Sequence, residues 1–248
     1  KSKKRNKNTY STVCINSNIT IGNGYLKLPK IGQVRLKQHR SIPKEYKLKS
    51  VTVSQTPSGN YYASILFEYE NQVQEKELQS FLGLDFSMHE LYRDSNGNEP
   101  AYPGYYRKAE KKLAKEQRKL SRMQKGSKNR DKQRIRVAKL HEKVSNQRKD
   151  FLHKQSRQIT NACDCVCIED LDMKAMSQSL NFGKSVMDNG WGMFTAFLKY
   201  KLEEQGKRLV KVDRFFASSQ ICNICGYKNP ETKNLAVRAW DCPQCGKH

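Results

Sequence analysis

Apolar and polar positions alternate through the first third of the chain, as they do in strands that bury one face. Residues 51–70, VTVSQTPSGNYYASILFEYE, predict two strands joined by a turn, because residues 57–60 supply Pro, Ser, Gly and Asn. Shorter alternation occurs in residues 25–37. Residues 1–78 are therefore predicted to form a small β-barrel or sandwich. The shared apolar face of the two longer strands would hold Val51, Val53, Ile65, Phe67 and Tyr69.

The pattern changes in the middle of the chain. FLGLDFS, residues 81–87, predicts an apolar strand, and residues 90–94 predict a second strand before a Ser-Asn-Gly-Asn turn. Between residues 103 and 161 apolar side chains recur at helical spacing, with a break at Gly126 and Ser127. This spacing predicts a hairpin of two long helices. Its apolar positions are Leu113, Leu120, Met123, Ile135, Val137, Leu140, Val144, Phe151 and Ile159.

Strands and helices follow one another in the last third. VCIED, residues 166–170, predicts a strand that ends in acids, and residues 208–213 predict another strand. Between them, residues 182–206 predict one amphipathic helix that stops near Gly206. Its apolar stripe would be Trp191, Phe194, Phe197, Leu198 and Leu202. The part of the chain that follows residue 78 is therefore predicted to be α/β.

Basic residues outnumber acidic residues by a wide margin. The 248 residues include 47 Lys and Arg against 24 Asp and Glu, a formal net charge of +23. Such an excess favours a polyanionic partner, because it otherwise destabilises the compact state by self-repulsion. Nucleic acid is the leading candidate, and an anionic membrane surface is the alternative. The absence of an apolar run long enough to span a bilayer weakens that alternative.

The predicted helical hairpin holds much of this charge, about twenty Lys or Arg against about five acids. An ordinary solvated helix face is one explanation. Basic residues would line most of the non-apolar surface, however, so we expect contacts to phosphate groups. The candidates on the first helix are Arg107, Lys111, Lys112, Lys115, Arg118 and Lys119. Tyr105 and Tyr106 could stack on bases or pack in the core.

Four cysteines near the end of the chain form two Cys-x-x-Cys pairs with sixteen residues between them. This spacing suits tetrahedral Zn²⁺ held by two knuckles, and a closed four-cysteine site is structural. Gly226 and Gly246 follow the second cysteine of each pair, where a knuckle turn often needs a positive φ. Two disulfides are the alternative, which fits poorly with a chain that shows no secretory signal and is expected in a reducing cytoplasm. The predicted zinc ligands are Cys222, Cys225, Cys242 and Cys245.

Three further cysteines, Cys163, Cys165 and Cys167, alternate along a predicted strand. All three would point to one face and lie nearly in line, so they could not surround a tetrahedral ion. We interpret them as small buried hydrophobic residues.

Two acids lie in apolar surroundings. Asp85 is inside FLGLDFS, where a buried charge costs free energy unless it is paired or binds a metal, and Glu169 ends the strand VCIED. Carboxylates on neighbouring strands are suitable ligands for Mg²⁺, and two such ions can promote phosphodiester cleavage. The alternative is that both are strand-end acids paired with a lysine.

The order of these motifs resembles that of a known family. GLDFS, the basic hairpin, IEDLDMKAM, DRFFASSQICNICG and WDCPQCG follow one another as in TnpB, the transposon-encoded RNA-guided nuclease related to type V CRISPR effectors. The resemblance covers essentially the whole chain. It implies a β-barrel-like wedge fragment over residues 1–78, an RNase H-like (RuvC) core over 79–215 with the hairpin at about 103–161, and a zinc ribbon for target nucleic acid over 216–248.

The resemblance also implies a function. TnpB proteins cut DNA selected by a guide RNA, so guide RNA and target DNA are the expected partners, and the cytoplasm or nucleoid the expected location. Asp85 and Glu169 match the first two of three catalytic acids that bind Mg²⁺. The third acid follows the cysteine ribbon in that family, in a stretch resembling HDRD, whereas this sequence ends CGKH.

Because of that ending, we expect the sequence to represent part of an active enzyme and to be inactive by itself. Two other functions remain open. The protein could be an RNA-guided DNA-binding repressor without nuclease activity, or a transposase with a DDE-type acidic triad, which would bind transposon ends without RNA.

Overall fold

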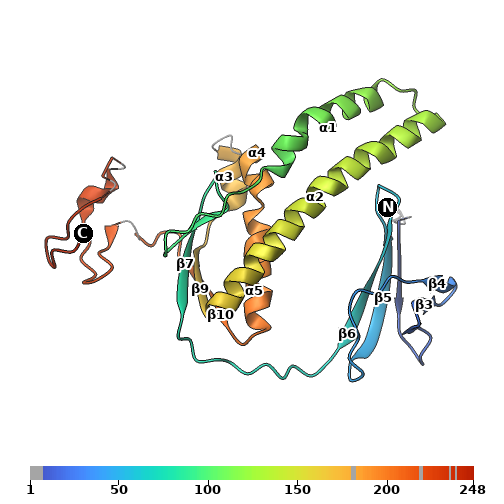
Figure 1. Cartoon of the computed structure of the whole chain (residues 1–248), viewed down its shortest axis with the longest axis horizontal. Coiled ribbons are helices and arrows are strands. Elements are labelled where there is room, and N and C mark those ends of the chain that lie inside the picture. The colour runs from blue at the N-terminus through green and yellow to red at the C-terminus, as the bar shows by residue number, and fades with distance from the viewer. Residues whose placement is uncertain (1–7, 180–182, 218–219, 235, 238) are drawn as a thin grey trace, which may run out of the picture. The chain divides into compact units, whose positions relative to one another are not determined.

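The computed structural model describes residues 8–179, 183–217, 220–234, 236–237 and 239–248 (Figure 1). The chain divides into two compact units. The first comprises residues 1–75 and 103–155, and the second residues 76–102 and 156–248. Among the described residues, no helix is both long and apolar enough to cross a membrane.

The β-rich part of the first unit contains two antiparallel sheets of three strands. β1 (Thr9–Val13), β5 (Lys47–Gln55) and β6 (Tyr61–Glu68) form one sheet in that order. The second sheet contains β2 (Thr20–Gly22), β3 (Tyr25–Leu28) and β4 (Gly32–Arg35). One apolar cluster of buried residues contains Leu26 and Leu28 of β3, Val51 of β5, and Ile19, which precedes β2.

The predicted strand pair in residues 51–70 is confirmed as β5 and β6, but β6 ends at Glu68, and Tyr69, which was predicted on the shared apolar face, is 54% exposed. Val51 pairs with Ile65 and Val53 with Ala63, so the alternating apolar residues share the inner face of the sheet. The turn at residues 56–60 closes with a hydrogen bond from the Thr56 amide to the Asn60 carbonyl oxygen. Assignment of these sheets to a wedge barrel stays a prediction.

The predicted helical hairpin is confirmed as α1 (Tyr105–Ser121) and α2 (Lys128–Ala162). Gly126 adopts a φ of 86° in the connecting turn, as a left-handed conformation requires. Inside the hairpin, the Gln133 side-chain amide donates to the Glu116 carboxylate at 2.6 Å, and both residues are buried. This hydrogen bond holds the pKa of Glu116 below its ordinary value. The buried apolar side chains of the hairpin include Leu113, Val137 and Val144.

The second unit is built on a sheet of four strands in the order β10-β9-β7-β8. β7 (Phe81–Phe86), β9 (Cys165–Glu169) and β10 (Arg208–Val212) are parallel, and β8 (Tyr92–Asp94) is an antiparallel edge strand. This arrangement confirms α/β content in this part of the chain.

Helix α5 (Trp191–Glu203) packs against the sheet through aromatic side chains. The Trp191 ring lies 5.5 Å from that of Phe86, and the Phe194 ring stacks on Tyr92 at 5.6 Å. These contacts cover one face of the sheet. The buried side chains of that face include Leu82, Leu84, Val166 and Ile168.

The prediction of one helix over residues 182–206 is wrong. The structure contains two helices there, α4 (Gly183–Asn189) and α5, and Gly190 between them has a φ of 75°. A left-handed residue cannot continue a right-handed helix, so the chain turns at this point. A short helix, α3 (Met173–Ser179), precedes α4, and a 3₁₀ turn, η2 (Pro230–Lys233), lies between the cysteine pairs.

Candidate catalytic acids and metal centre

The four predicted metal ligands come together. The sulfur atoms of Cys222, Cys225, Cys242 and Cys245 all lie within 4.8 Å of one another. The sulfur of Cys222 lies 3.6 Å from that of Cys245, and the sulfur of Cys225 lies 3.5 Å from that of Cys242. A tetrahedral ion with metal–sulfur bonds of about 2.3 Å needs sulfurs about 3.8 Å apart. A disulfide would need about 2.05 Å, so the alternative of two disulfides is not supported.

Each cysteine pair forms a tight turn that aims both thiols inward. Gly226 and Gly246 have φ angles of 74° and 68°, which confirms the predicted positive values. Their amides donate to the carbonyl oxygens of Cys222 and Cys242 at 3.0 and 2.8 Å. Backbone amides of Cys225 and Ile224 lower the pKa of Cys222 to about 6 and so favour its thiolate. The cluster can therefore hold a metal ion.

The two predicted catalytic acids lie at the same level of the sheet. The pairing of β7 with β9 ends at Leu84 and Ile168, and Asp85 and Glu169 are the next residue on each strand. Neighbouring strands are about 4.8 Å apart, and residues at equal offset in parallel strands point to the same face. The two carboxylates therefore lie side by side at the carboxyl ends of parallel strands, where open α/β sheets commonly bind ligands.

The expected burial of Asp85 is wrong. β7 buries Leu82 and Leu84 on the face toward α5, but its other face, which includes Phe81 and Asp85, is exposed. Glu169 is half-buried. Among the described residues, neither carboxylate forms a hydrogen bond or salt bridge, so no lysine pairs with them. Arg93, opposite Asp85 in β8, forms a salt bridge with Glu99.

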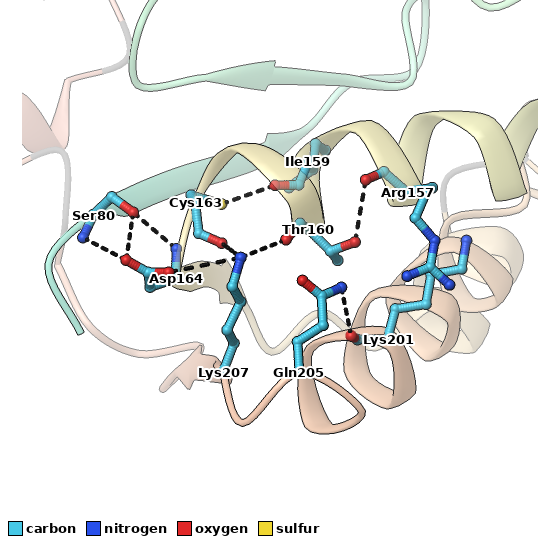
Figure 2. A network of polar contacts seen from close by, with 9 residues as sticks. All are labelled: Ser80, Arg157, Ile159, Thr160, Cys163, Asp164, Lys201, Gln205 and Lys207. Atoms are coloured by element: carbon cyan, nitrogen blue, oxygen red, sulfur yellow. Dashed lines mark hydrogen bonds and ion pairs between the residues drawn. The ribbon is translucent and has the colours of Figure 1, made fainter. Parts of the chain in front are cut away.

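A polar network at the opposite end of the same strands sets this alignment (Figure 2). Ser80, Asp164 and Lys207 each immediately precede one of the parallel strands β7, β9 and β10. The Ser80 hydroxyl donates to the Asp164 carboxylate at 2.8 Å, and the Asp164 amide donates back to the hydroxyl at 2.9 Å. Asp85 and Glu169 each lie five residues further on, so this network brings them level.

Lys207 connects the network to the end of α2. Its ammonium donates to the carbonyl oxygens of Thr160 and Cys163 at 2.7 and 3.0 Å and lies 3.6 Å from a carboxylate oxygen of Asp164. These carbonyl groups are at the carboxyl end of a helix, where a cation is favourable. The Lys207 side chain is 7% exposed, so these contacts are largely shielded from water.

The segment that follows Asp85 is held by Asn189, which is 1% exposed. Its side-chain amide donates to the carbonyl oxygens of Ser87 and Glu90 at 2.9 and 2.8 Å. Asn189 ends α4 and precedes the left-handed Gly190. The break between the two helices therefore places a buried amide behind the strand that contains Asp85.

Sequence patterns did not identify these supporting residues. Ser80, Asp164 and Lys207 are ordinary polar residues in the sequence, and the only signal is that each directly precedes an apolar strand. Asn189 has no signal beyond the glycine that follows it.

The three central cysteines differ from the prediction in one respect. Cys165 and Cys167 lie on β9, but Cys163 precedes the strand, and its thiol donates to the Ile159 carbonyl oxygen at 3.2 Å. Burial raises the pKa of Cys165 to about 11, so this thiol stays protonated. Among the described residues, the ribbon cysteines are the only metal-type cluster, which agrees with the interpretation as small apolar residues.

The predicted phosphate-binding side chains all lie on α1 and are exposed: Arg107, Lys111, Lys112, Lys115, Arg118 and Lys119. Tyr105 and Tyr106 are half-buried. The Tyr105 ring meets the Phe151 ring edge-on at 6.3 Å, which favours packing over base stacking for this residue.

Known proteins are similar to this chain. The family model OrfB_IS605, described as "Probable transposase", matches residues 64–180, and the model "Cas12f1-like, TNB domain" matches residues 191–248. A protein of Streptomyces pristinaespiralis named "Putative RNA-guided DNA endonuclease" is 33% identical over 245 residues, 98% of this chain and 60% of that protein. The resemblance to the TnpB family is confirmed.

A second relative has a similar name. "Putative RNA-guided DNA endonuclease InsQ" of Escherichia coli (strain K12) is 31% identical over 226 residues, 85% of this chain and 55% of that protein. The chain thus spans about 60% or less of the length of these relatives. The fold is similar to that in a cryo-EM structure of a Cas12f1-sgRNA-target DNA complex, with a TM-score of 0.52 and 16% identity over 81% of this chain and 44% of that one.

Proposed function

We propose that this chain is the catalytic part of an RNA-guided DNA endonuclease of an insertion sequence. The observation that carries the proposal is the pair Asp85 and Glu169, which lies level on adjacent parallel strands. Among the described residues, neither carboxylate forms a hydrogen bond or salt bridge. Both acids fall within the region that matches the OrfB_IS605 model. The names of the relatives support DNA as the substrate and RNA as the guide.

The sheet of the second unit would be the RuvC core of RNase H-like fold, the two β-sheets of the first unit the wedge, and residues 216–248 the zinc ribbon. The three parallel strands and the antiparallel edge strand of the second unit's sheet support its assignment as the core. The ribbon cysteines would hold structural Zn²⁺, because their sulfur spacing suits its tetrahedral shell. The protein would act in the cytoplasm, and on the nucleoid when bound to DNA.

Asp85 and Glu169 would bind Mg²⁺ through their carboxylate oxygens, the ligand type that this cation prefers. When bound, Mg²⁺ supplies Lewis-acid stabilisation of the scissile phosphate and activation of water. The level strands fix the spacing of the two carboxylates, and the exposure of Asp85 lets a phosphodiester approach them. A third carboxylate, which the resemblance to the family implies, would complete the set.

The basic residues on α1 would contact phosphate groups of the guide or the heteroduplex, without reading sequence. Their exposure supports this role. Each phosphate contact contributes about one unit to the dependence of the logarithm of affinity on the logarithm of salt concentration. Replacement of Lys111 and Lys115 by Gln should therefore lower that slope by about two.

The test uses the complete reading frame with its guide RNA, a matched plasmid library and Mg²⁺. Linear product is expected from the natural protein and not from the Asp85→Ala or Glu169→Gln variant. Glu203→Gln is the matched control, because it removes an exposed acid on α5 whose partner is Lys199. Guide-dependent binding without cleavage would instead indicate a repressor. Binding of transposon ends without RNA would support the transposase named in the family description.

A further inference from the structure

Two exposed aromatic side chains follow the last strand of the sheet. Phe215 is 87% exposed, the largest fraction among the exposed large hydrophobic side chains of the described residues, and Phe216 is 53% exposed. They lie three and four residues after Val212, which pairs with Glu169 in the parallel register. The Cα atom of Phe215 therefore lies within about 16 Å of that of Glu169.

The turn that presents these rings is held by hydrogen bonds. The carboxylate of Asp213 accepts from the Phe215 amide at 2.7 Å, and its carbonyl oxygen accepts from the Phe216 amide at 2.9 Å. Asp213, two residues before Phe215, thus fixes the backbone of the pair, while both side chains remain exposed.

A charged cluster adjoins the turn. Asp170, the residue after Glu169, lies 3.0 Å from the Lys211 ammonium and 3.4 Å from the Arg214 guanidinium. The carboxylate of Asp170 therefore partly neutralises both cations, so they attract phosphate only weakly. The two aromatic rings are the main groups that this surface offers to a ligand.

We propose that Phe215 and Phe216 form a stacking platform for unpaired bases of the DNA strand that is cut, with Arg214 beside them. Flat, open aromatic faces recognise bases without sequence preference, and only unpaired bases can stack on them, because bases in a duplex cover one another. The proposal rests on the proposed nuclease function, since that function makes single-stranded DNA the substrate close to Glu169. The platform holds the strand within a few nucleotides of the acid pair.

The test measures binding without chemistry. The complete protein with its RNA, carrying Asp85→Ala, is titrated with a labelled single-stranded DNA of about 16 nucleotides that has no complementarity to the RNA. Dissociation constants are measured by fluorescence anisotropy at several salt concentrations. Phe215→Leu keeps an apolar side chain of similar size but removes the aromatic face, whereas Phe215→Trp enlarges that face.

Stacking predicts that Phe215→Leu weakens binding about fivefold and that Phe215→Trp binds at least as tightly as the parent. The salt dependence should not change with either variant, because no phosphate contact is lost. Phe81→Leu is the matched control. Phe81 is 63% exposed on the same sheet but lies at the opposite end of β7 from Asp85, so its variant should stay within about twofold of the parent.

The proposal is overturned if Phe215→Leu binds like the parent, if Phe81→Leu loses as much, or if Phe215→Trp behaves like Phe215→Leu. Tighter binding of RNA than of DNA of the same sequence would also overturn it. Cleavage is scored separately with Asp85 restored. Loss of binding in Phe215→Leu without any cleavage in the natural protein leaves the platform standing and removes the nuclease function, and the reverse result removes the platform alone.

Discussion

Lys207→Met should destabilise the second unit by about 3 kcal/mol. The substitution keeps the aliphatic stem and removes the ammonium, which donates two hydrogen bonds to carbonyl groups at the end of α2. Hydrogen bonds from charged groups contribute about 1.5–3 kcal/mol each, and removal of one member of a shielded ion pair costs about 3–5 kcal/mol. These two free energies count the same contacts in part, so they do not add. The variant also no longer has to desolvate an ammonium group, which offsets part of the loss.

Lys211→Met is the matched control. Lys211 lies on β10 and pairs with Asp170 at 3.0 Å, a shorter distance than the 3.6 Å between Lys207 and Asp164. Its side chain is 58% exposed, however, and exposed ion pairs contribute about 0–1 kcal/mol. If burial rather than distance decides the contribution, Lys211→Met should cost less than about 1 kcal/mol.

Urea unfolding followed by tryptophan fluorescence measures both variants, because Trp191, the first residue of α5, is buried against the sheet and reports on this unit. Equal costs for Lys207→Met and Lys211→Met would refute the reasoning. The cost of Lys207→Met should also shrink in acid. The hydrogen bond from Ser80 lowers the pKa of Asp164, so its ionised contribution is present above the ordinary value of 3.8 and is lost as pH falls through the lower, folded value.

Three further substitutions test other parts of the structure. Asn189→Ala leaves the carbonyl groups of Ser87 and Glu90 without their side-chain donor and should cost about 2 kcal/mol in urea unfolding, whereas a cost under about 0.5 kcal/mol would mean that these two hydrogen bonds contribute little. Burial lowers the pKa of Lys201 to about 8, so the folded state binds fewer protons than the unfolded state up to about pH 10.5. Between about pH 8 and pH 10.5 the unfolding free energy of the natural protein should therefore rise relative to that of the Lys201→Met variant. Parallel pH profiles of the two proteins would contradict this. Cys225→Ser should abolish stoichiometric zinc in elemental analysis, and full retention would show that three thiolates suffice.

The elements of this fold follow largely from local sequence. The β5–β6 pair and the helical hairpin are recognisable because alternation and helical spacing repeat within short windows. The cysteine cluster is equally local, since two knuckles of fixed geometry place their own thiols. The prediction of one helix over residues 182–206 was wrong because a single residue, Gly190, separates α4 from α5. Its left-handed conformation is compatible with glycine, but nothing local required it.

The relation between the two acids could be suspected from sequence, but only the tertiary structure aligned them. Asp85 and Glu169 are brought level by a contact between Ser80 and Asp164, which are 84 residues apart in the chain. A shift of one residue in this pairing would turn one carboxylate to the opposite face of the sheet. The exposure of Asp85 was likewise not predictable, because an apolar strand sequence does not state which face other elements cover. Propensity and spacing act over a few residues, whereas register and burial depend on polar contacts and packing between distant segments, and so only the folded chain decides them.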